Sequence, residues 1–547
     1  MKYLHLLVSL CCVYGIAIND AQPQGLRDHV GREFIVVFGP NTGGEPDVET
    51  NNEMSIVLTT TTPANVTIEA AGVNLSRQRS LGAGVSEAVV LPSGNDGGPT
   101  VMVQRTDNEK VLPRSAVHVI SDADISVFGR NHKRYSTDAF LVLPVDALGR
   151  SYRVMSYPVS MGQGAPMPSQ FMIAAIEHNT EVQITLAANS ASGRKKGERF
   201  TVTLGKLDVY LVQSSLFGGE DLTGTIIEAN KPIAVFSGHE RAAVPEGAVL
   251  YDGSPASRDH LVEQLPPVEA LGDTFLLAPL PGTQRPSVLR LLAVAPNTRV
   301  SIDGVQFAVL QEGEIFTIGE FHMPRLLVSS KPALVAHFLP TAMGRLGDTQ
   351  IPAWGDPAMT IVPPVEQYLK DYAFHVYEPP TTEGVGRKFI TLVLPAQAYS
   401  TTFIDDAGLG TVNSIEGTDW VTTTLELQAG FHRIRSSHAI GVTIFGMTAI
   451  GSIALPAGMG VEPGGLTKSD VGPEATIVAE EKTIIIGPDR QLRLPLQDVS
   501  SALEIYDRAG RLIERSEARP GSLDLSNYAA GIYFYRTSEA KGSFLIP

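Results

Sequence analysis

One short residue pattern occurs four times along this chain, and it constrains the fold more than any other feature. It is a small or polar turn followed by an apolar run, as in Lys231–Glu240 (KPIAVFSGHE) and Lys331–Pro340 (KPALVAHFLP), with related copies at Asp122–Asn131 and His438–Met447. The central valines of the four copies are Val127, Val235, Val335 and Val442. They lie 108, 100 and 107 residues apart. A period of this size is one small domain, so the chain is predicted to be a string of about four similar modules.

A second pattern runs in step with the first, and each copy begins with an aspartate. It occurs from Asp138, Asp259 and Asp356. Each copy contains a Pro-Val pair, and the three prolines are Pro144, Pro267 and Pro364. Proline has no N–H to give to a sheet ladder, so each pair is expected at the start of a strand or at a sheet edge. Short runs of β-branched and aromatic residues, separated by Gly, Pro, Asn and Asp, predict that every copy is a β-unit.

The composition favours the same class of fold. At 547 residues the chain is long enough for several domains, each able to bury a core. Gly (52) and Pro (37) are numerous, and only 18% of residues are charged. These features predict an all-β fold, with tandem repeated β-sandwich-like modules and a small C-terminal Ig-like β-sandwich. A net charge of −16 argues against nucleic acid as a partner.

The first residues have the pattern of an export signal. Lys2 precedes the apolar run 4–18, and cleavage is expected after Ala17 or Ala21. The run is short for a membrane span, so no transmembrane segment is expected in the mature protein. Both cysteines lie inside the signal, which leaves the mature protein without a disulfide or a Cys-ligated metal. A long exported protein without disulfides favours a bacterial source.

The C-terminal segment resembles the sorting domain of the type IX secretion system. The matching pieces are LEIYDRAGR (503–511), LDLSNYAAGIYFYR (523–536) and KGSF (541–544). The family usually opens with Tyr-Pro-Asn-Pro, whereas residues 486–489 here read Ile-Gly-Pro-Asp. The resemblance implies passage through the outer membrane with the type IX machinery as partner, and the alternative is an ordinary Ig-like stalk module. The residues expected to carry the signal are Tyr506, Asp507, Gly510, Gly531, Tyr533, Lys541 and Gly542.

The body of the chain resembles the N-terminal domain of the IgG Fc-binding protein family. The resemblance covers roughly residues 31–450 and is most specific at EANKPIAVFSGH (228–239) and DHLVEQLPPVEALGDTFLLAPLP (259–281). The cysteine-rich von Willebrand-type modules of the animal members are absent. The family implies binding or adhesion, but immunoglobulin binding itself is not carried over, and no catalytic residues are available to transfer.

The repeats and the two resemblances together divide the chain into segments. They are a signal peptide (1–21), four β-modules (22–134, 135–250, 251–345 and 346–455), a linker (456–475) and the sorting domain (476–547).

Motifs of catalysis and metal binding are absent from the sequence. There is no Gly-x-Ser-x-Gly nucleophile elbow, and His239–Ala243 lacks the second histidine of a zincin helix. His132 and His239 follow equivalent strands and could meet at a metal, but such histidines more often end a strand and bind a carbonyl group. The carboxylate pairs Asp405-Asp406 and Glu220-Asp221 are expected to be turn residues. We therefore predict no enzyme, no catalytic residue, no cofactor and no metal.

Long loops are where β-modules usually carry recognition. They are expected at 41–52, 162–169, 253–258 and 343–356, and the last contains Trp354. An exposed Trp354 would stack on a sugar or anchor a protein, and the alternative is burial under its loop.

These observations predict a bacterial protein exported through the periplasm to the outer-membrane surface or beyond. Its expected function is binding or adhesion to a host, matrix or polysaccharide ligand, so its partner is an extracellular protein or glycan. Two other classes stay open. One is a secreted hydrolase acting on polysaccharide or protein, and the other is a self-assembling surface-coat protein.

Overall fold

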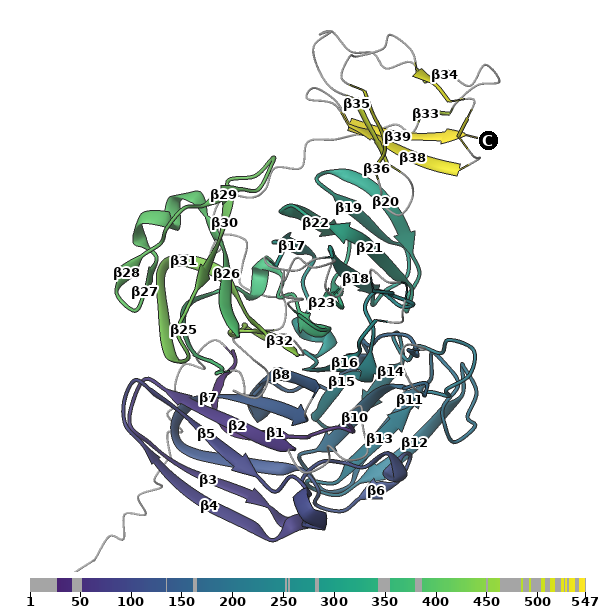
Figure 1. Cartoon of the computed structure of the whole chain (residues 1–547). Coiled ribbons are helices and arrows are strands. Elements are labelled where there is room, and N and C mark those ends of the chain that lie inside the picture. The colour runs from purple at the N-terminus through teal and green to yellow at the C-terminus, as the bar shows by residue number, and fades with distance from the viewer. Residues whose placement is uncertain are drawn as a thin grey trace, which may run out of the picture.

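The computed structural model confirms an all-β protein whose units surround a common centre (Figure 1). It describes residues 27–41, 52–133, 135–160, 165–250, 253, 256–280, 285–342, 355–378, 386–448 and 451–462, together with short segments between 484 and 546. Trp354, Ala17 and Ala21 lie outside these residues. The four groups of strands follow one another around the ring in sequence order, from purple through blue and teal to green in Figure 1.

The first unit is a single seven-stranded sheet. Its strands are β1 (Val30–Val36), β2 (Glu53–Thr60), β3 (Ala64–Ala70), β4 (Leu75–Leu81), β5 (Val85–Leu91), β7 (Val117–Lys133) and β8 (Ser136–Val142).

The second unit has a five-stranded and a four-stranded sheet. The five strands are β6 (Val111–Leu112), β10 (Ser169–Ala175), β13 (Val209–Gln213), β15 (Ile233–Ala242) and β16 (Asp259–Gln264). The four strands are β9 (Ser151–Arg153), β11 (Thr180–Thr185), β12 (Arg199–Leu204) and β14 (Ile226–Ala229).

The third unit has two sheets, as the second has, and the fourth has a single sheet, as the first has. Two four-stranded sheets form the third unit: β17 (Thr274–Leu277), β19 (Thr298–Ile302), β20 (Val305–Leu310) and β22 (Arg325–Ser329), and β18 (Ser287–Ala293), β21 (Ile315–Phe321), β23 (Ala333–Leu339) and β24 (Ala358–Ile361). An eight-stranded sheet forms the fourth: β25 (Leu369–Val376), β26 (Arg387–Pro395), β27 (Phe403–Ile404), β28 (Ala407–Gly408), β29 (Asn413–Ser414), β30 (Trp420–Glu426), β31 (Gly430–Met447) and β32 (Ser452–Pro456).

Each repeated valine lies on a strand next to the centre of the ring. These strands are β7, β15, β23 and β31, and each pairs antiparallel with the strand that follows it, β8, β16, β24 or β32. We call the latter four the inner strands. Neighbouring inner strands contact one another in the closed order β8, β16, β24, β32 and back to β8, and β8 and β24 also contact one another across the axis. The four sheets that contain the inner strands therefore radiate from one axis, as blades do in a propeller.

The side chain of Asp138 joins all four inner strands at this axis. Its carboxylate accepts N–H groups from Ala139 at 2.9 Å, Val262 at 3.2 Å, Met359 at 3.2 Å and Ala454 at 3.4 Å, one from each inner strand. The aspartate is fully buried. Burial raises its pKa well above the usual range, while the four backbone N–H groups oppose this shift.

A second carboxylate occupies the neighbouring layer of the axis, two residues earlier on each inner strand. Asp259 accepts the N–H groups of Thr137, of His260 at 2.8 Å and of Ser452 at 3.3 Å. At the corresponding position Pro357 directly precedes the third inner strand, β24, and proline has no N–H to donate. Asp259 therefore accepts an N–H from every inner strand that has one at this position.

The layer on the other side of Asp138 contains Glu263. Its carboxylate accepts the N–H of Ile361 at 3.4 Å and hydrogen bonds with the N–H of Leu141 and the side chain of Thr360. The corresponding position on the fourth inner strand is Pro456, again without an N–H. Burial raises the pKa of Asp259 and of Glu263 well above the usual range, and the charge of Asp138 adds to the effect on Glu263.

Close glycine–proline contacts form three of the seams between units. A Cβ on Gly31 would lie 2.4 Å from Pro144, one on Gly149 would lie 2.4 Å from Pro267, and one on Gly272 would lie 2.7 Å from Pro364. Each of these prolines follows an inner strand and precedes a short 3-10 helix, Val145–Ala147, Val268–Ala270 or Val365–Gln367. Among the described residues, the other short 3-10 helices are Ala71–Val73, Asn95–Gly97, Arg105–Asp107 and Ala396–Thr401.

The two ends of the body close the ring. Asp28 forms an isolated antiparallel bridge with Gly460, and the N–H of Val461 donates to the carbonyl of Arg27 at 2.8 Å. His29 packs against this closure, because a Cβ on Gly458 would lie 2.3 Å from its ring. Segments more than 400 residues apart in sequence therefore hold the first and fourth units together.

Strand pairing crosses the predicted module boundaries. β8 begins after the boundary at 134/135 and pairs with β7 before it, and β16 and β24 pair backward across 250/251 and 345/346 in the same way. Each inner strand thus begins the next predicted module while belonging by hydrogen bonding to the preceding sheet. The boundaries themselves stay a prediction.

The described part of the C-terminal region consists mainly of short strands. They are β33 (Ile484–Ile485), β34 (Gln491–Leu492), β35 (Leu503–Tyr506), β36 (Leu512–Ser516), β37 (Leu523–Asp524), β38 (Gly531–Arg536) and β39 (Lys541–Ile546). Five of them form one sheet, in the order β33-β39-β38-β35-β36. No helix among the described residues of the protein has the length and apolar character to cross a membrane.

Candidate binding face

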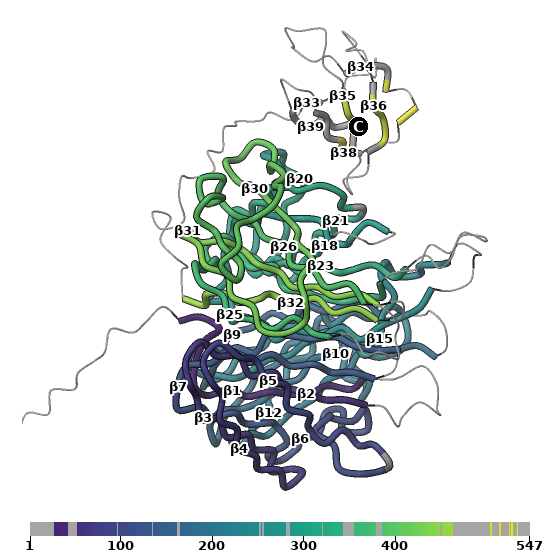
Figure 2. The backbone as a smooth tube through the Cα atoms, turned by 60° about the vertical axis from the view of Figure 1, so that its left-hand side comes forward, coloured from purple at the N-terminus to yellow at the C-terminus, as the bar shows by residue number. Residues whose placement is uncertain are grey.

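Most connections between strands next to the axis reverse at one end of the ring. The start of β2 at Glu53 lies opposite His132 at the end of β7, and Ser169 at the start of β10 lies opposite His239 near the end of β15. The third and fourth units have the same register, with Arg387 opposite Met447 in the fourth. Figure 2, in which these strands run from side to side, shows this alignment. We call this end the loop face, and its described parts are 39–41, 52–53, 131–133, 135–137, 165–169, 214–225, 240–250, 256–260, 285–287, 322–324, 339–342, 355–358, 376–378, 386–388, 446–448 and 451–453.

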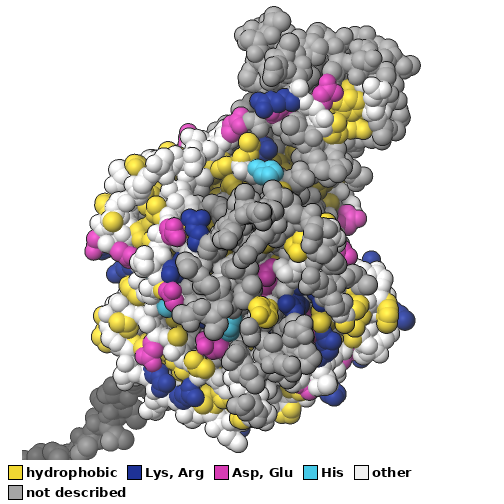
Figure 3. All heavy atoms as spheres, in the orientation of Figure 1, with side chains coloured by type: hydrophobic (Ala, Val, Ile, Leu, Met, Phe, Trp, Pro, Cys, Tyr) yellow, Lys and Arg dark blue, Asp and Glu magenta, His cyan; other side chains and the backbone are white. Residues whose placement is uncertain are grey.

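Three large apolar side chains are exposed on the turns of the loop face. Phe217 is 83% exposed, Met323 49% and Val249 47%. They come from the second and third units, on the turns after β13, β21 and β15 respectively. Exposed apolar side chains on turns held by a rigid scaffold are a common feature of binding surfaces. On the side of the molecule shown in Figure 3, apolar, basic and acidic side chains are interspersed.

A buried polar network fixes the loop face where the first and second units meet. Arg105 pairs with the buried carboxylate of Glu240 at 2.7 Å. The amide nitrogen of Gln213 donates to Glu240 and to Gln170, both at 3.0 Å, and Gln170 donates to the carbonyl of Pro40 at 2.8 Å. Both partners of the ion pair are engaged, so this network is a rigid support for the turns above it.

The histidines behind the loop face are neutral at pH 7. Burial lowers the pKa of His132 to about 3, of His239 to about 3 and of His260 to about 4. His239 accepts the backbone N–H of Arg241 through Nδ1 at 3.0 Å, so it bonds locally as a histidine near a strand end commonly does. In the part of the protein that the structure describes, no three His, Cys, Asp or Glu side chains are grouped to hold a metal ion.

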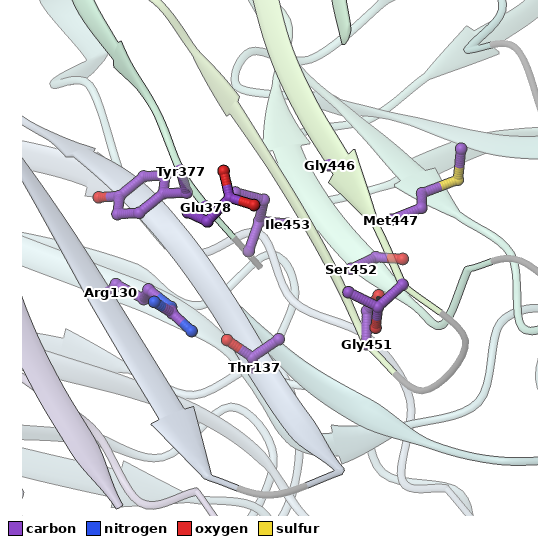
Figure 4. Close-up of a pocket in the computed structure, with 10 residues that line it drawn as sticks. Arg130, Thr137, Tyr377, Glu378, Gly446, Met447, Gly451, Ser452 and Ile453 are labelled. Atoms are coloured by element: carbon purple, nitrogen blue, oxygen red, sulfur yellow. Dashed lines mark hydrogen bonds between the residues drawn. The ribbon is translucent and has the colours of Figure 1, made fainter. Parts of the chain in front are cut away.

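A small cleft opens on the loop face where the fourth unit meets the first (Figure 4). Its volume is about 30 Å³. Arg130 and Thr137 line it from the first unit, and Tyr377, Met447 and Ile453 line it from the fourth. In Figure 4 the guanidinium of Arg130 and the hydroxyl of Thr137 point toward one another, while the Tyr377 hydroxyl points away.

The acidic pairs of the sequence have structural partners. Asp221 pairs with Arg290 at 2.6 Å, which joins the second and third units. Asp405 hydrogen bonds with Nδ1 of His432 at 2.6 Å, and Asp406 forms an ion pair with Arg435. Glu220 accepts the backbone N–H of Asn189 at 2.9 Å. These carboxylates hold turns and seams in place.

The predicted sorting residues are only partly within the described residues. Asp507 and Gly510 lie outside them, Tyr506 ends β35, and Gly531 begins β38. Tyr533 is buried within β38, with its ring 5.3 Å from that of Tyr528, and Lys541 and Gly542 begin β39. Their role in sorting stays a prediction.

The ring and its loop face define a repeat-built all-β protein whose described polar clusters support the scaffold. The family model described as IgGFc binding protein matches residues 138–446, more than half of the chain, and the chain therefore belongs to that family. The match begins at Asp138 on the first inner strand and ends near the end of β31. This confirms the family expected for the body of the chain.

A curated relative agrees with this assignment. The human IgGFc-binding protein is 26% identical over 401 residues, which cover 71% of this chain. The match spans only 7% of the length of that human protein. A solved Corynebacterium diphtheriae protein, thought to be membrane-anchored, aligns with 77% of this chain and all of its own at 10% identity, but the TM-score of 0.09 carries no argument.

Proposed function

We propose that this protein is a non-catalytic binding protein that recognises an extracellular protein or glycan through the loop face of its ring. The observation that carries the proposal is the collection of turns from all four units at one end of a closed scaffold whose axis is hydrogen-bonded. Such an arrangement lets the turns vary while the scaffold stays fixed, as in other β-folds used for recognition. The family supports a protein ligand, since its human relative is named for binding the Fc region of IgG.

The location of the protein is part of this proposal. The signal-like start and the resemblance of residues 476–547 to a sorting domain support export by a bacterium through its periplasm. The type IX machinery would then deliver the protein to the outer-membrane surface or the medium. Deleting 476–547 should leave the body in the periplasm, and cell fractionation measures this. Unchanged surface delivery of the truncated protein would contradict the sorting role.

A binding screen tests the proposed activity directly. The protein from residue 22 onward is presented to immunoglobulin, mucins, matrix proteins and polysaccharides, and saturable binding to one of them is expected. Phe217→Ala and Met323→Ala should weaken that binding about ten-fold or more, in the range of exposed aromatic or apolar anchors at interfaces.

A matched control comes from the opposite end of the ring. Phe403 on β27 is 41% exposed and lies beyond the end of β26 that is far from the loop face. Phe403→Ala should leave binding unchanged. Equal losses in all three variants would refute the loop face as the binding surface, and self-association without any ligand would favour a surface-coat protein.

A further inference from the structure

The cleft between the fourth and first units contains the buried guanidinium of Arg130, whose positive charge is only partly balanced by the carboxylate near it. Arg130 on β7 is 9% exposed. Its charged neighbour is Glu53, at 3.7 Å and itself 42% exposed in its side chain. That distance is beyond an ordinary hydrogen bond, and the exposed carboxylate is well solvated. The guanidinium therefore retains N–H groups for another acceptor.

The aromatic ring beside Arg130 leaves the edge of the guanidinium open. The central carbon of the Arg130 guanidinium lies 5.9 Å from the centre of the Tyr377 ring. A guanidinium that stacks on the face of an aromatic ring keeps its N–H groups, which lie in its own plane, available for hydrogen bonds. The other acid lining the cleft, Glu378, is paired with Lys388 at 3.0 Å. Neither group neutralises Arg130.

The second polar group in the cleft is a hydroxyl with no partner among the described residues. Thr137 is 4% exposed, and its Oγ1 is buried without a hydrogen bond. Its backbone N–H is already used by Asp259 on the axis, so the residue is held in position. A buried hydroxyl without a partner costs free energy unless a bound group satisfies it.

The size of the cleft limits what these two groups can bind. A cavity of about 30 Å³ has room for about two water-sized oxygen atoms. A carboxylate presents two oxygens in one plane, which matches the paired N–H groups of a guanidinium. Phosphate and sulfate carry four oxygens in a tetrahedral arrangement, so a cleft of this size takes only part of either anion. The apolar side chains of Met447 and Ile453 lower the local dielectric and strengthen a charge-assisted bond.

We propose that Arg130 and Thr137 form a subsite for a carboxylate group of the ligand. The proposal rests on the proposed function, because it names the chemistry of one contact on the loop face. Arg130 donates to both carboxylate oxygens, and the Thr137 hydroxyl donates to one of them. An acidic side chain, the free C-terminus of a peptide and an acidic sugar all carry this chemistry.

Nuclear magnetic resonance titration of the full protein from residue 22 tests the subsite without the macromolecular ligand. The probes are acetate, an N-acetyl-glutamate amide, an N-acetyl dipeptide with a free C-terminus, and glucuronate, against chloride and sulfate at matched ionic strength. We expect saturable binding of acetate and tighter binding of one of the larger carboxylates, which identifies the source. Sulfate should compete no better than chloride.

Two variants and one control localise the effect. Arg130→Gln should weaken carboxylate binding about ten-fold or more, the range of a hydrogen bond to a charged group. Thr137→Val preserves the shape and should weaken it by about three-fold to ten-fold. Arg299→Gln, an exposed arginine on β19, should change nothing.

The outcomes separate this inference from the proposed function. Equal carboxylate binding by wild type, Arg130→Gln and Thr137→Val, or no binding above chloride, would overturn the subsite even where Phe217→Ala still abolishes macromolecular binding. Carboxylate binding that depends on Arg130 supports the subsite even where the binding screen finds no macromolecular ligand. Thermal unfolding of each variant verifies that it is folded under the titration conditions.

Discussion

The axis and the loop-face cleft both bury polar side chains, but the axis supplies hydrogen-bond partners for them and the cleft does not. On the axis, Asp138 accepts a backbone N–H from every inner strand, and Asp259 accepts one from each strand that has one to give. In the cleft, the guanidinium of Arg130 lies 3.7 Å from the half-exposed carboxylate of Glu53, and the Thr137 hydroxyl has no partner among the described residues. The two regions lie within a few residues of each other on β7 and β8.

The difference separates structure from binding. A buried polar group that is fully hydrogen-bonded specifies one arrangement of the strands around it. A buried polar group with unused donors is costly alone and favourable once an acceptor arrives. The axis is therefore expected to control stability, whereas the cleft and the exposed turns are expected to control affinity with little effect on stability.

The largest expected effect is the loss of the central carboxylate. Asp138→Ala leaves four backbone N–H groups on the axis without their acceptor, so the free energy of unfolding should fall by about 3–5 kcal/mol. Urea unfolding followed by circular dichroism measures the change. Glu177→Ala, on an exposed turn at the opposite end of the ring, is the control and should change stability by less than about 0.5 kcal/mol. Equal effects of the two substitutions would remove the axis from the comparison.

The pH dependence of stability is the second test of the axis. Because burial raises the pKa values of Asp138, Asp259 and Glu263, the folded protein holds more protons than the unfolded protein above about pH 4. Stability from these groups is therefore complete below their unfolded pKa values and decreases as the pH rises toward the folded ones. Of the other groups near the axis, Asp356 also has a raised pKa, of about 6, while the charge of Arg241 favours ionised Asp259 and Asp356.

The buried histidines act in the other direction at lower pH. The pKa values of His132 and His239 fall to about 3, so these residues add stability as the pH rises from about 3 to 6.5 and nothing further above that. From about pH 4 upward the carboxylates act against the histidines, and their contribution to stability should fall by up to about 1.4 kcal/mol per pH unit for each carboxyl group until its folded pKa is reached. Glu263→Gln should make the slope in this window shallower. Unfolding midpoints that stay constant across the window would show that the axis carboxylates do not hold protons there.

The sequence predicted the all-β class and the four-fold repetition, because both depend on local patterns. The pairing of each repeated strand with the next one, and the closed ring, depend on contacts between residues far apart in sequence, which a periodic pattern does not specify. Asp138 is the first residue of the second pattern. An aspartate before an apolar run is also common in turns, so the sequence does not distinguish an axial aspartate from a turn residue. Nothing marked Pro357 and Pro456 as the positions where an axial N–H is missing.

The cleft was less predictable still. Arg130 lies inside the first repeated pattern, where an arginine near a strand end is expected to be solvated. Tyr377 comes from the fourth unit, almost 250 residues later, so no spacing rule connects the two. The exposed Phe217 lies in a Ser-Leu-Phe-Gly turn that carries no motif. A search for large apolar residues within Gly-rich turns is the signal that would have found it.

A smaller effect is expected at the seams between units. Gly149→Ala places a methyl group 2.4 Å from the Cβ of Pro267, and relief of this overlap should cost about 1–3 kcal/mol. The matched control is Gly82→Ala, since a Cβ there would meet nothing within 4 Å. Urea unfolding compares the two. If Gly149→Ala and Gly82→Ala had the same effect on the free energy of unfolding, the neighbouring units would be more loosely packed than the axis.

The smallest effect on stability is expected at the loop face, and it is the one that completes the comparison. Phe217 is 83% exposed and adds little burial in the free protein, so Phe217→Ala should change the free energy of unfolding by less than about 0.5 kcal/mol. Its loss should still weaken ligand binding, since its contacts form only in the complex. Measuring unfolding and binding on the same preparation gives both values. If Phe217→Ala destabilised the fold as much as Gly149→Ala, the loop face would be part of the scaffold, and the distinction between a satisfied axis and an available face would fail.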